Sequence, residues 1–411
     1  LVEAQIVRRV EDRWIGFSLS RKLWGVFEKH WLSAGRVQTP VLGWIIQRYE
    51  EYGRSVKPTF RVELENGMVL VLEDVKLDGT SPRELARRIS EEGVEINDVR
   101  CSVEEVQPPP PFSTDAMLRD APRALRVGVD VVMALAQDLF ELGLITYHRT
   151  DSVRVSTAGM AVAREYISDQ YGPGEFVARE WAKGGAHECI RPTRPIDAQT
   201  LRDLIRQDVI RLAQPLTPKH YALYDIIFKR FMASQMRAAR VEVQSFRVSG
   251  PGFEKEMRVY IGVPDPGFTR VYMPFRLSPR VEPGRYAVTS VEYRKRPTIP
   301  LYSQSDVIQL MKERGIGRPS TYAKIVKTLL DRGYVYENKK GKLIPMKLGI
   351  QVYKYLVDNF HDMVSEERTR MIERMMDEIE EGKADYLDVL RNLYGEIVRI
   401  EGGDVQGPVR R

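Results

Sequence analysis

A tyrosine stands two residues before an arginine in the segment 144–152, which reads LITYHRTDS. A phenol is a poor nucleophile at neutral pH, because its ordinary pKa is about 10. A neighbouring cation favours the phenolate and can also neutralise the charge that grows on a phosphodiester oxygen. Tyr147 and Arg149 therefore predict a nucleophile and its electrostatic partner in phosphoryl transfer to tyrosine. The alternatives are a half-buried packing role for Tyr147 and a surface ion pair of Arg149 with Asp151.

Other side chains that could bind a phosphate follow later in the chain. Arg191 offers a rigid bidentate fork for a phosphate, and an ion pair that tethers a helix or loop explains it equally well. Arg318, Ser320 and Thr321 stand at the start of a helical pattern. The unpaired amides and the dipole of a helix N-terminus favour an anion there, although an ordinary N-cap also accounts for the two hydroxyls.

Composition limits the class of protein. The net charge of +6, from 63 basic and 57 acidic residues, permits a nucleic-acid partner without requiring one. No apolar run approaches the roughly 20 residues needed to cross a bilayer. Cys101 and Cys189 form no Cys-x-x-Cys metal motif, so we expect reduced buried thiols in a cytoplasmic protein, with Cys189 as a packing residue. The many charged residues and few asparagines fit a heat-adapted source.

The elements that must position these side chains alternate in type along the chain, which predicts a multidomain α+β fold. The order is helical, β-rich, helical, β-rich and helical. It suggests that the first and last helical segments form one domain, that the two β-rich segments form another, and that the chain passes through both twice. The expected segments are a helical base over 1–54, a β-rich segment over 55–110, a helical segment with Tyr147 over 111–238, a second β-rich segment over 239–297, a second helical segment over 298–400 and a tail over 401–411.

Helical spacing of apolar residues sets the expected helices. A helix over 130–142 is followed by Gly143, so Tyr147 should lie just past a helix end, where side chains are accessible. Residues 201–212 and 363–381 predict two further helices. The expected apolar faces include Ile6, Val10, Trp14 and Phe17 in the first helix, and Val364, Met371, Met375 and Ile379 in the helix over 363–381.

The region from residue 305 predicts a winged helix, because two helical patterns are followed by two short strands that flank a basic turn. The lysines of that turn are expected to be a solvated hairpin tip. They are Lys339, Lys340 and Lys342.

The segment around Tyr147 resembles the active-site stretch of the type IA DNA topoisomerases, in which this tyrosine attacks single-stranded DNA and holds the 5′ phosphate covalently. Further stretches are similar to motifs of that family in the family's order. They are LSAGRVQ at 32–38, PPPPFSTD at 108–115, GAHECIRPT at 185–193 and GIGRPSTY at 315–322. Within the family, segments 5–17 and 220–236 resemble the topoisomerase half of the reverse gyrase branch.

The resemblance implies a fold and a site. Type IA enzymes form a ring around DNA from a helical base with winged-helix domains, a β-rich arch and a helical catalytic domain. The resemblance further implies that Tyr147, Arg149 and His187 are catalytic. The residues implied to contact DNA are Arg36, Gln38, Arg191, Arg318, Ser320 and Thr321.

Two modules of the family have no counterpart in the sequence. There is no Asp-x-Asp pair with an upstream glutamate and no Gly-x-x-x-x-Gly-Lys-Ser/Thr motif. We therefore expect no metal ligands in this chain, Mg²⁺ from a missing acidic domain and ATP only through a missing helicase-like half. The chain does not begin with methionine, which fits an upstream partner.

The expected function is cleavage and religation of single-stranded DNA through a 5′-phosphotyrosine. Joined to an ATP-driven helicase-like module, this activity would introduce positive supercoils. The alternatives are an ordinary type IA relaxing enzyme and a DNA-binding scaffold that is inactive alone.

Overall fold

The computed structural model describes residues 2–73, 75–184 and 187–401. Gly185 and Ala186 of one expected motif, and all but the first residue of the expected tail, lie outside the described residues. The chain forms two compact units, each built from segments far apart in sequence. The first unit contains Leu1–Glu50, Leu118–Val131 and Leu301–Arg411; the second contains Glu51–Met117 and Val132–Pro300.

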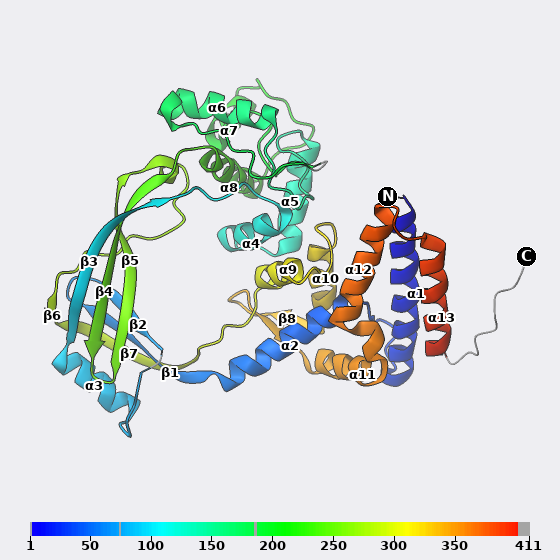
Figure 1. Ribbon diagram of the computed structural model, residues 1–411, viewed down its shortest axis with the longest axis horizontal. Helices are drawn as coiled ribbons and strands as arrows, with labels where there is room; N and C mark the ends of the chain where they lie inside the picture. The colour runs from blue at the N-terminus through cyan, green and yellow to red at the C-terminus, as the bar shows by residue number, and fades with distance from the viewer. Residues whose placement is uncertain (1, 74, 185–186, 402–411) are drawn as a thin grey trace, which may run out of the picture. The chain divides into compact units, whose positions relative to one another are not determined.

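In the first unit, the long helix α1 (Val2–Phe27) lies beside three helices from the end of the chain, α11 (Lys347–Val364), α12 (Glu366–Glu380) and α13 (Tyr386–Glu401) (Figure 1). The core of this bundle contains Val7, Ile372, Met376, Ile379 and Leu393. The helix α2 (Gln38–Arg54) begins with a buried stretch that includes Val41, Leu42, Ile45 and Ile46.

The apolar face expected for the first helix is wrong. Ile6 and Phe17 are 43% and 59% exposed, whereas Val7, Ile15 and Leu19 are at most 1% exposed. Two apolar stripes with the same spacing run along α1, and local periodicity cannot decide which of them meets a partner.

The helix expected over 363–381 is α12, which begins at Glu366, while Met363 and Val364 belong to the end of α11. Ser365 ends α11 and N-caps α12, because its hydroxyl accepts a hydrogen bond from the Arg368 amide. The apolar face expected for this helix is partly right: Val364 and Ile379 are buried, whereas Met371 is exposed and Ile372 and Met376 are buried in its place.

The predicted winged helix has the expected elements. Helix α9 (Gln304–Glu313) and helix α10 (Tyr322–Asp331) precede strands β8 (Val335–Glu337) and β9 (Leu343–Pro345), which pair antiparallel. Ser303 and Asp306 form a capping box at the start of α9.

The second unit contains two antiparallel sheets. Strands β1 (Val56–Leu64), β2 (Val69–Leu72) and β7 (Val288–Pro297) form one sheet in the order β2-β1-β7. Strands β3 (Val94–Val106), β4 (Ala239–Gly250), β5 (Phe253–Asp265) and β6 (Gly284–Tyr286) form the other, in the order β5-β4-β3-β6 (Figure 1). The predicted turn at Gly67 joins β1 to β2 with φ of 81°. Helix α3 (Pro82–Glu92) buries Leu85 and Ile89 in a core shared with both sheets.

The segment that carries Tyr147 follows α5 (Val129–Glu141) in the second unit. Helix α4 (Thr114–Leu125) and α5 each cross the boundary between the two units, because residues 118–131 belong to the first. The other helical elements of the second unit are α6 (Thr157–Tyr171), α7 (Ala198–Arg206) and α8 (Pro218–Ser234), with short 3₁₀ turns η1 (Pro173–Glu175) and η2 (Gly267–Arg270). Helix α7 ends six residues before the expected end at residue 212. Asp208, with φ of 60°, takes the chain out of the helix there.

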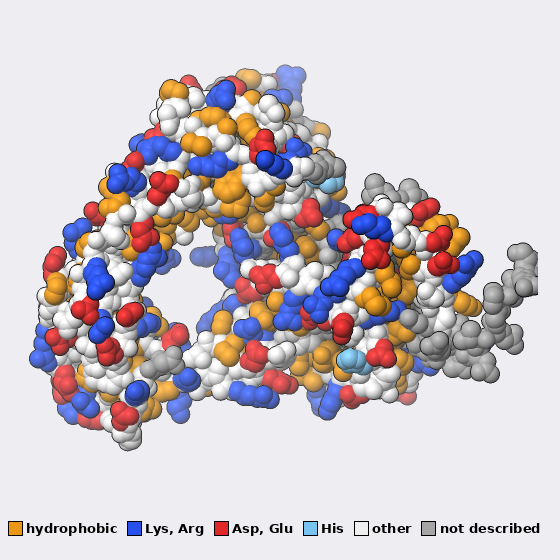
Figure 2. Space-filling model, in the orientation of Figure 1, with side chains coloured by type: hydrophobic (Ala, Val, Ile, Leu, Met, Phe, Trp, Pro, Cys, Tyr) orange, Lys and Arg blue, Asp and Glu red, His pale blue; other side chains and the backbone are white. Residues whose placement is uncertain are grey.

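Charged side chains of both signs cover the visible face of the molecule, with Lys and Arg interleaved with Asp and Glu (Figure 2). No described helix is long and apolar enough to cross a membrane.

Candidate active site

Tyr147 lies in the loop that follows α5, and backbone hydrogen bonds hold this loop on both sides. The Thr146 amide donates to the Arg191 carbonyl at 2.9 Å, and the Thr146 hydroxyl donates to the Cys189 carbonyl at 2.7 Å. On the other side, the Thr150 amide donates to the Thr114 hydroxyl at 2.8 Å. Three of the sequence motifs therefore meet in one place, because residues 112–115, 144–152 and 187–193 are joined by hydrogen bonds.

The Tyr147 side chain is 41% exposed, although Ile145, His148 and Thr150 of the same loop are buried. Its ring contacts the rings of Phe140 and His148 edge to face, with centroids 5.3 and 5.6 Å apart. The His187 ring lies 6.0 Å from it, centroid to centroid. This arrangement leaves the phenol accessible on a rigid loop, as a nucleophile requires.

His148 is a buried residue of the site that the sequence analysis did not single out. Its side chain is fully buried, and its Nε2 accepts a hydrogen bond from the Arg149 Nε at 3.3 Å. Burial, together with the Arg149 charge, lowers the pKa of His148 to about 4, so the imidazole is neutral at cellular pH. A neutral ring that accepts at Nε2 carries its proton on Nδ1, and no described residue bonds that Nδ1.

Arg149 is exposed, so the neutral imidazole holds a cation whose far end remains open to solvent. A histidine between a tyrosine and an arginine has no sequence signal of its own, since its burial depends on the packing of Phe140, whose ring lies 6.1 Å from it.

Arg191 belongs to the same cluster, but its guanidinium is already paired with the carboxylate of Glu188. Its Nε and Nη2 donate to the two oxygens of Glu188, both at 2.9 Å, and its side chain is 7% exposed. Although burial alone would raise it, hydrogen bonds from Arg191 and Ser156 hold the pKa of Glu188 below its usual range. The ion pair, one of the two roles left open by the sequence, is the arrangement observed.

Cys189 is a packing residue, as predicted. Its side chain is fully buried, and burial raises the pKa of the thiol to about 12. It is therefore not a reactive thiol. Cys101 was expected to be buried as well, and this expectation is wrong, because Cys101 is exposed on β3.

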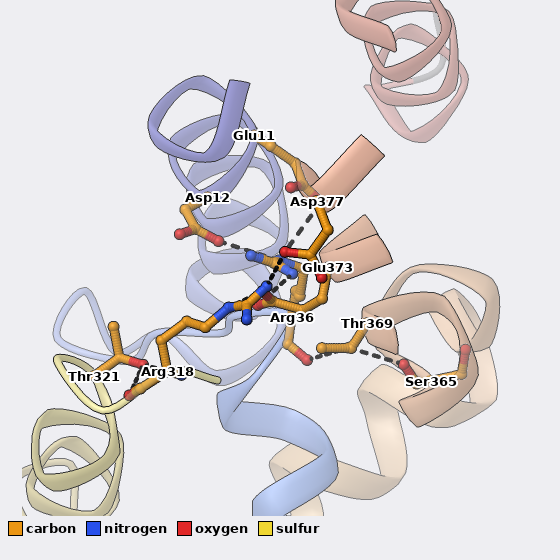
Figure 3. A network of polar contacts seen from close by, with 9 residues as sticks. All are labelled: Glu11, Asp12, Arg36, Arg318, Thr321, Ser365, Thr369, Glu373 and Asp377. Atoms are coloured by element: carbon orange, nitrogen blue, oxygen red, sulfur yellow. Dashed lines mark hydrogen bonds and ion pairs between the residues drawn. The ribbon is translucent and has the colours of Figure 1, made fainter. Parts of the chain in front are cut away.

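The remaining predicted DNA contacts belong to the first unit, where Arg36 and Arg318 share one set of carboxylates (Figure 3). Arg36 is 3% exposed. Its Nε lies 3.2 Å from the Asp12 Oδ1, and its Nη1 lies 3.3 Å from the Glu373 Oε1. Its backbone carbonyl accepts from Thr369 at 2.9 Å. Arg36 thus fastens the loop before α2 to α1 and α12.

Glu11 completes this cluster and carries an unusual carboxyl group. Its side chain is fully buried, and neither oxygen forms a hydrogen bond to a described residue, although the Arg36 Nε lies 3.5 Å from Oε1. Burial raises the pKa of Glu11 to about 7, and the Arg36 charge limits the rise.

Arg318 is the accessible member of the cluster, with a side chain 36% exposed. It donates to the Glu373 Oε2 at 3.0 Å and to the Asp377 Oδ1 at 2.6 Å. Thr321 caps the turn, because its hydroxyl accepts from the Arg318 amide at 3.0 Å. Ser320 is exposed beside them, whereas Gln38 is buried and donates to the Ser33 carbonyl at 3.4 Å.

The structure thus gathers Tyr147, Arg149, His187 and Arg191 in the second unit and the other five predicted residues in the first. Among the described residues, no group of His, Cys, Asp or Glu side chains could hold a metal ion. The cluster around Arg36 contains several carboxylates, but those of Asp12 and Glu373 are ion-paired with the guanidinium groups of Arg36 and Arg318.

A family model described as DNA topoisomerase matches residues 1–391. The chain is similar to the reverse gyrase of Pyrococcus furiosus, with 52% identity over 401 residues that cover 97% of this chain and 32% of that protein. It is 47% identical over 410 residues to reverse gyrase 1 of Aquifex aeolicus, covering 98% of this chain and 35% of that protein. The chain therefore spans about a third of the length of these relatives.

A solved structure, full-length topoisomerase I from Thermotoga maritima, is similar in fold, with a TM-score of 0.78 and 31% identity. The match covers 99% of this chain and 69% of that one.

Proposed function

The chain belongs to the type IA DNA topoisomerase family, and we propose that it cuts and reseals one DNA strand through Tyr147. The phenol oxygen attacks a backbone phosphorus, and the bond from phosphorus to the 3′ oxygen breaks. The tyrosine proton ends on the leaving 3′ hydroxyl, and the 5′ phosphate stays on Tyr147. Because one phosphate ester replaces another, attack by the 3′ hydroxyl reseals the strand without ATP.

The observation that carries this proposal is the exposed Tyr147 phenol on a loop that is tied down on both sides. Arg149, held by neutral His148, is the cation that would stabilise charge on the phosphate oxygens. His187, whose ring lies beside that of Tyr147, would hydrogen-bond the scissile phosphate.

We assign the DNA contacts of the first unit to Arg318, Ser320 and Thr321, because these side chains are at least partly exposed. Arg36, Gln38 and Arg191 are buried and bonded within the protein, so they would act on DNA indirectly. They hold the loops that carry the direct contacts, a role that replaces the contact expected from sequence.

The domain scheme predicted from sequence is retained as part of this proposal, with residues 111–238 as the domain that carries Tyr147, except that residues 118–131 of this range pack in the first unit. The residues described here do not supply a Mg²⁺ site. We propose that Mg²⁺ is held by an acidic domain of the longer protein and ATP by a helicase-like half, whose coupling to this chain introduces positive supercoils in the cytoplasm.

The test uses a labelled single-stranded oligonucleotide with Mg²⁺, resolved on a denaturing gel, with the acidic domain added in trans. A covalent adduct that is absent from Tyr147→Phe is the expected result. Adduct formation by Tyr147→Phe would refute the assignment of the nucleophile.

A DNA-binding scaffold is the second candidate, because the described residues contain no group of metal ligands. Binding of the oligonucleotide without any adduct, even with the acidic domain present, would favour it.

A further inference from the structure

A groove of about 860 Å³ lies in the first unit, between the turn that joins α4 to α5 and the hairpin that joins β8 to β9. Arg123 at the end of α4 and Arg126 in the turn that follows line it on one side, and Lys339, Lys340 and Lys342 line it from the hairpin. These five cations, which we call the basic groove, come from segments about 200 residues apart in the sequence.

The walls of the groove are held in place by hydrogen bonds. The Gln304 side chain accepts from the Val129 amide at 3.4 Å and donates to Glu337 at 2.8 Å, so it joins both walls. In the hairpin, the Asn338 side chain accepts from the amides of Lys340 and Lys342 at 2.9 and 3.0 Å. The positions of the lysines therefore follow from a defined turn rather than from a loose tip.

Only part of the positive charge is neutralised within the protein. Asp306 accepts from Arg123 at 3.1 Å and from Lys342 at 3.3 Å. Although burial opposes it, bonds from Ser303 and the charges of Lys342 and Arg123 hold the pKa of Asp306 low, so this carboxylate is ionised. Among the described residues, no ion pair joins Arg126, Lys339 or Lys340 to a carboxylate, and all three are exposed.

The lining of the groove indicates which polyanion would fit. Sites for single-stranded nucleic acid combine cations with aromatic rings on which bases stack, and no aromatic residue lines this groove. Duplex DNA presents a dense row of phosphates and no exposed base face, so cations alone suffice to bind it. We propose that the basic groove contacts the phosphate backbone of double-stranded DNA. The inference rests on the proposed function for the nature of the substrate, and it adds a duplex contact to the single-strand site.

The test compares the full chain with its Arg126→Gln/Lys339→Gln/Lys340→Gln variant by fluorescence anisotropy, using a short duplex and a single strand of equal length. We expect the duplex affinity of the variant to fall about tenfold or more at low salt. The slope of log K against log salt should fall by about 2 to 3, since each phosphate contact contributes about 0.9. Single-strand affinity should change by less than about twofold.

The matched control removes three exposed lysines outside the groove, in Lys219→Gln/Lys347→Gln/Lys354→Gln. An equal loss of duplex binding in this control would overturn the proposal, because the effect would then follow from net charge. An equal loss of single-strand binding in the groove variant would overturn it as well. Both readouts are independent of cleavage, so a missing Tyr147 adduct would refute the proposed function without deciding the groove.

Discussion

The loop around Tyr147 and the cluster around Arg36 use arginine in opposite ways. Arg149 is exposed and bonded to a neutral imidazole, so its charge remains available to a ligand. Arg36 is buried and faces the carboxylates of Glu11, Asp12 and Glu373, so its charge is neutralised inside the protein. The comparison teaches that a motif arginine can serve chemistry in one place and connect segments of the chain in the other.

The largest expected effect is on stability, at Arg36. Replacing Arg36 with methionine leaves the buried Glu11 without its nearest cation and leaves Glu373 with Arg318 alone, which should lower the free energy of unfolding by about 3 to 5 kcal/mol. Urea unfolding followed by circular dichroism measures this change. Arg87→Met removes an exposed arginine paired with Glu84 and Glu91 on α3 and is the control, with a much smaller expected loss. Equal losses in the two variants would contradict the structural role of Arg36.

The next effect is on the reaction, at Arg149. Arg149→Gln removes the available charge, so the rate of adduct formation should fall by about 10²- to 10³-fold. The free energy of unfolding should stay within about 0.5 kcal/mol, because the side chain is exposed. Rapid-quench measurement of the adduct together with urea unfolding tests both parts. A variant that unfolds more easily but cleaves normally would show that Arg149, like Arg36, has a structural role and not a catalytic one.

The third effect is on the pH dependence of stability, through Glu11. Its folded pKa of about 7 lies above the ordinary value of 4.5, so the folded protein binds more protons than the unfolded chain between these two values. The contribution of Glu11 to stability is therefore largest at acidic pH and is lost as the pH rises from about 4.5 to about 7. The loss is on the order of 3 kcal/mol.

Glu11→Gln removes that titration while it keeps the shape of the side chain. The difference in unfolding free energy between the variant and the original chain should vary with pH across this window and level off above it. Arg36, Asp12, Arg368 and Glu373 are the charged groups that act on Glu11, and all of them remain in the variant. A constant difference from pH 4.5 to pH 8 would show that Glu11 is ionised throughout.

The smallest expected effect is at His148. His148→Met replaces the imidazole with an uncharged side chain that can fill the buried site but removes the acceptor for Arg149, so adduct formation should slow by roughly tenfold through misplacement of the cation. In His148→Gln, a side-chain oxygen can replace Nε2 as acceptor, which should restore part of the rate. Equal rates in these two variants would argue against a positioning role, since both lose the imidazole and only one keeps an acceptor.

Local patterns in the sequence determined much of this protein. The spacing of apolar residues located helices such as α5, α9 and α10 but not α4, α6, α11 or α13. The residue types around Tyr147 predicted a nucleophile and its cation. Local patterns were insufficient where two faces of one element were equally apolar, as in α1, or where a capping residue such as Ser365 set the boundary between two consecutive helices.

Only the tertiary structure decided which charged residues are neutralised. Arg36 meets Glu373 across 337 positions of sequence, and Arg126 lines a groove with Lys339, which follows more than 200 positions later. A guanidinium has the same sequence signature whether it binds a phosphate or a carboxylate. The outcome depends on burial and on the partner that packing supplies, and both are set by segments that are distant along the chain.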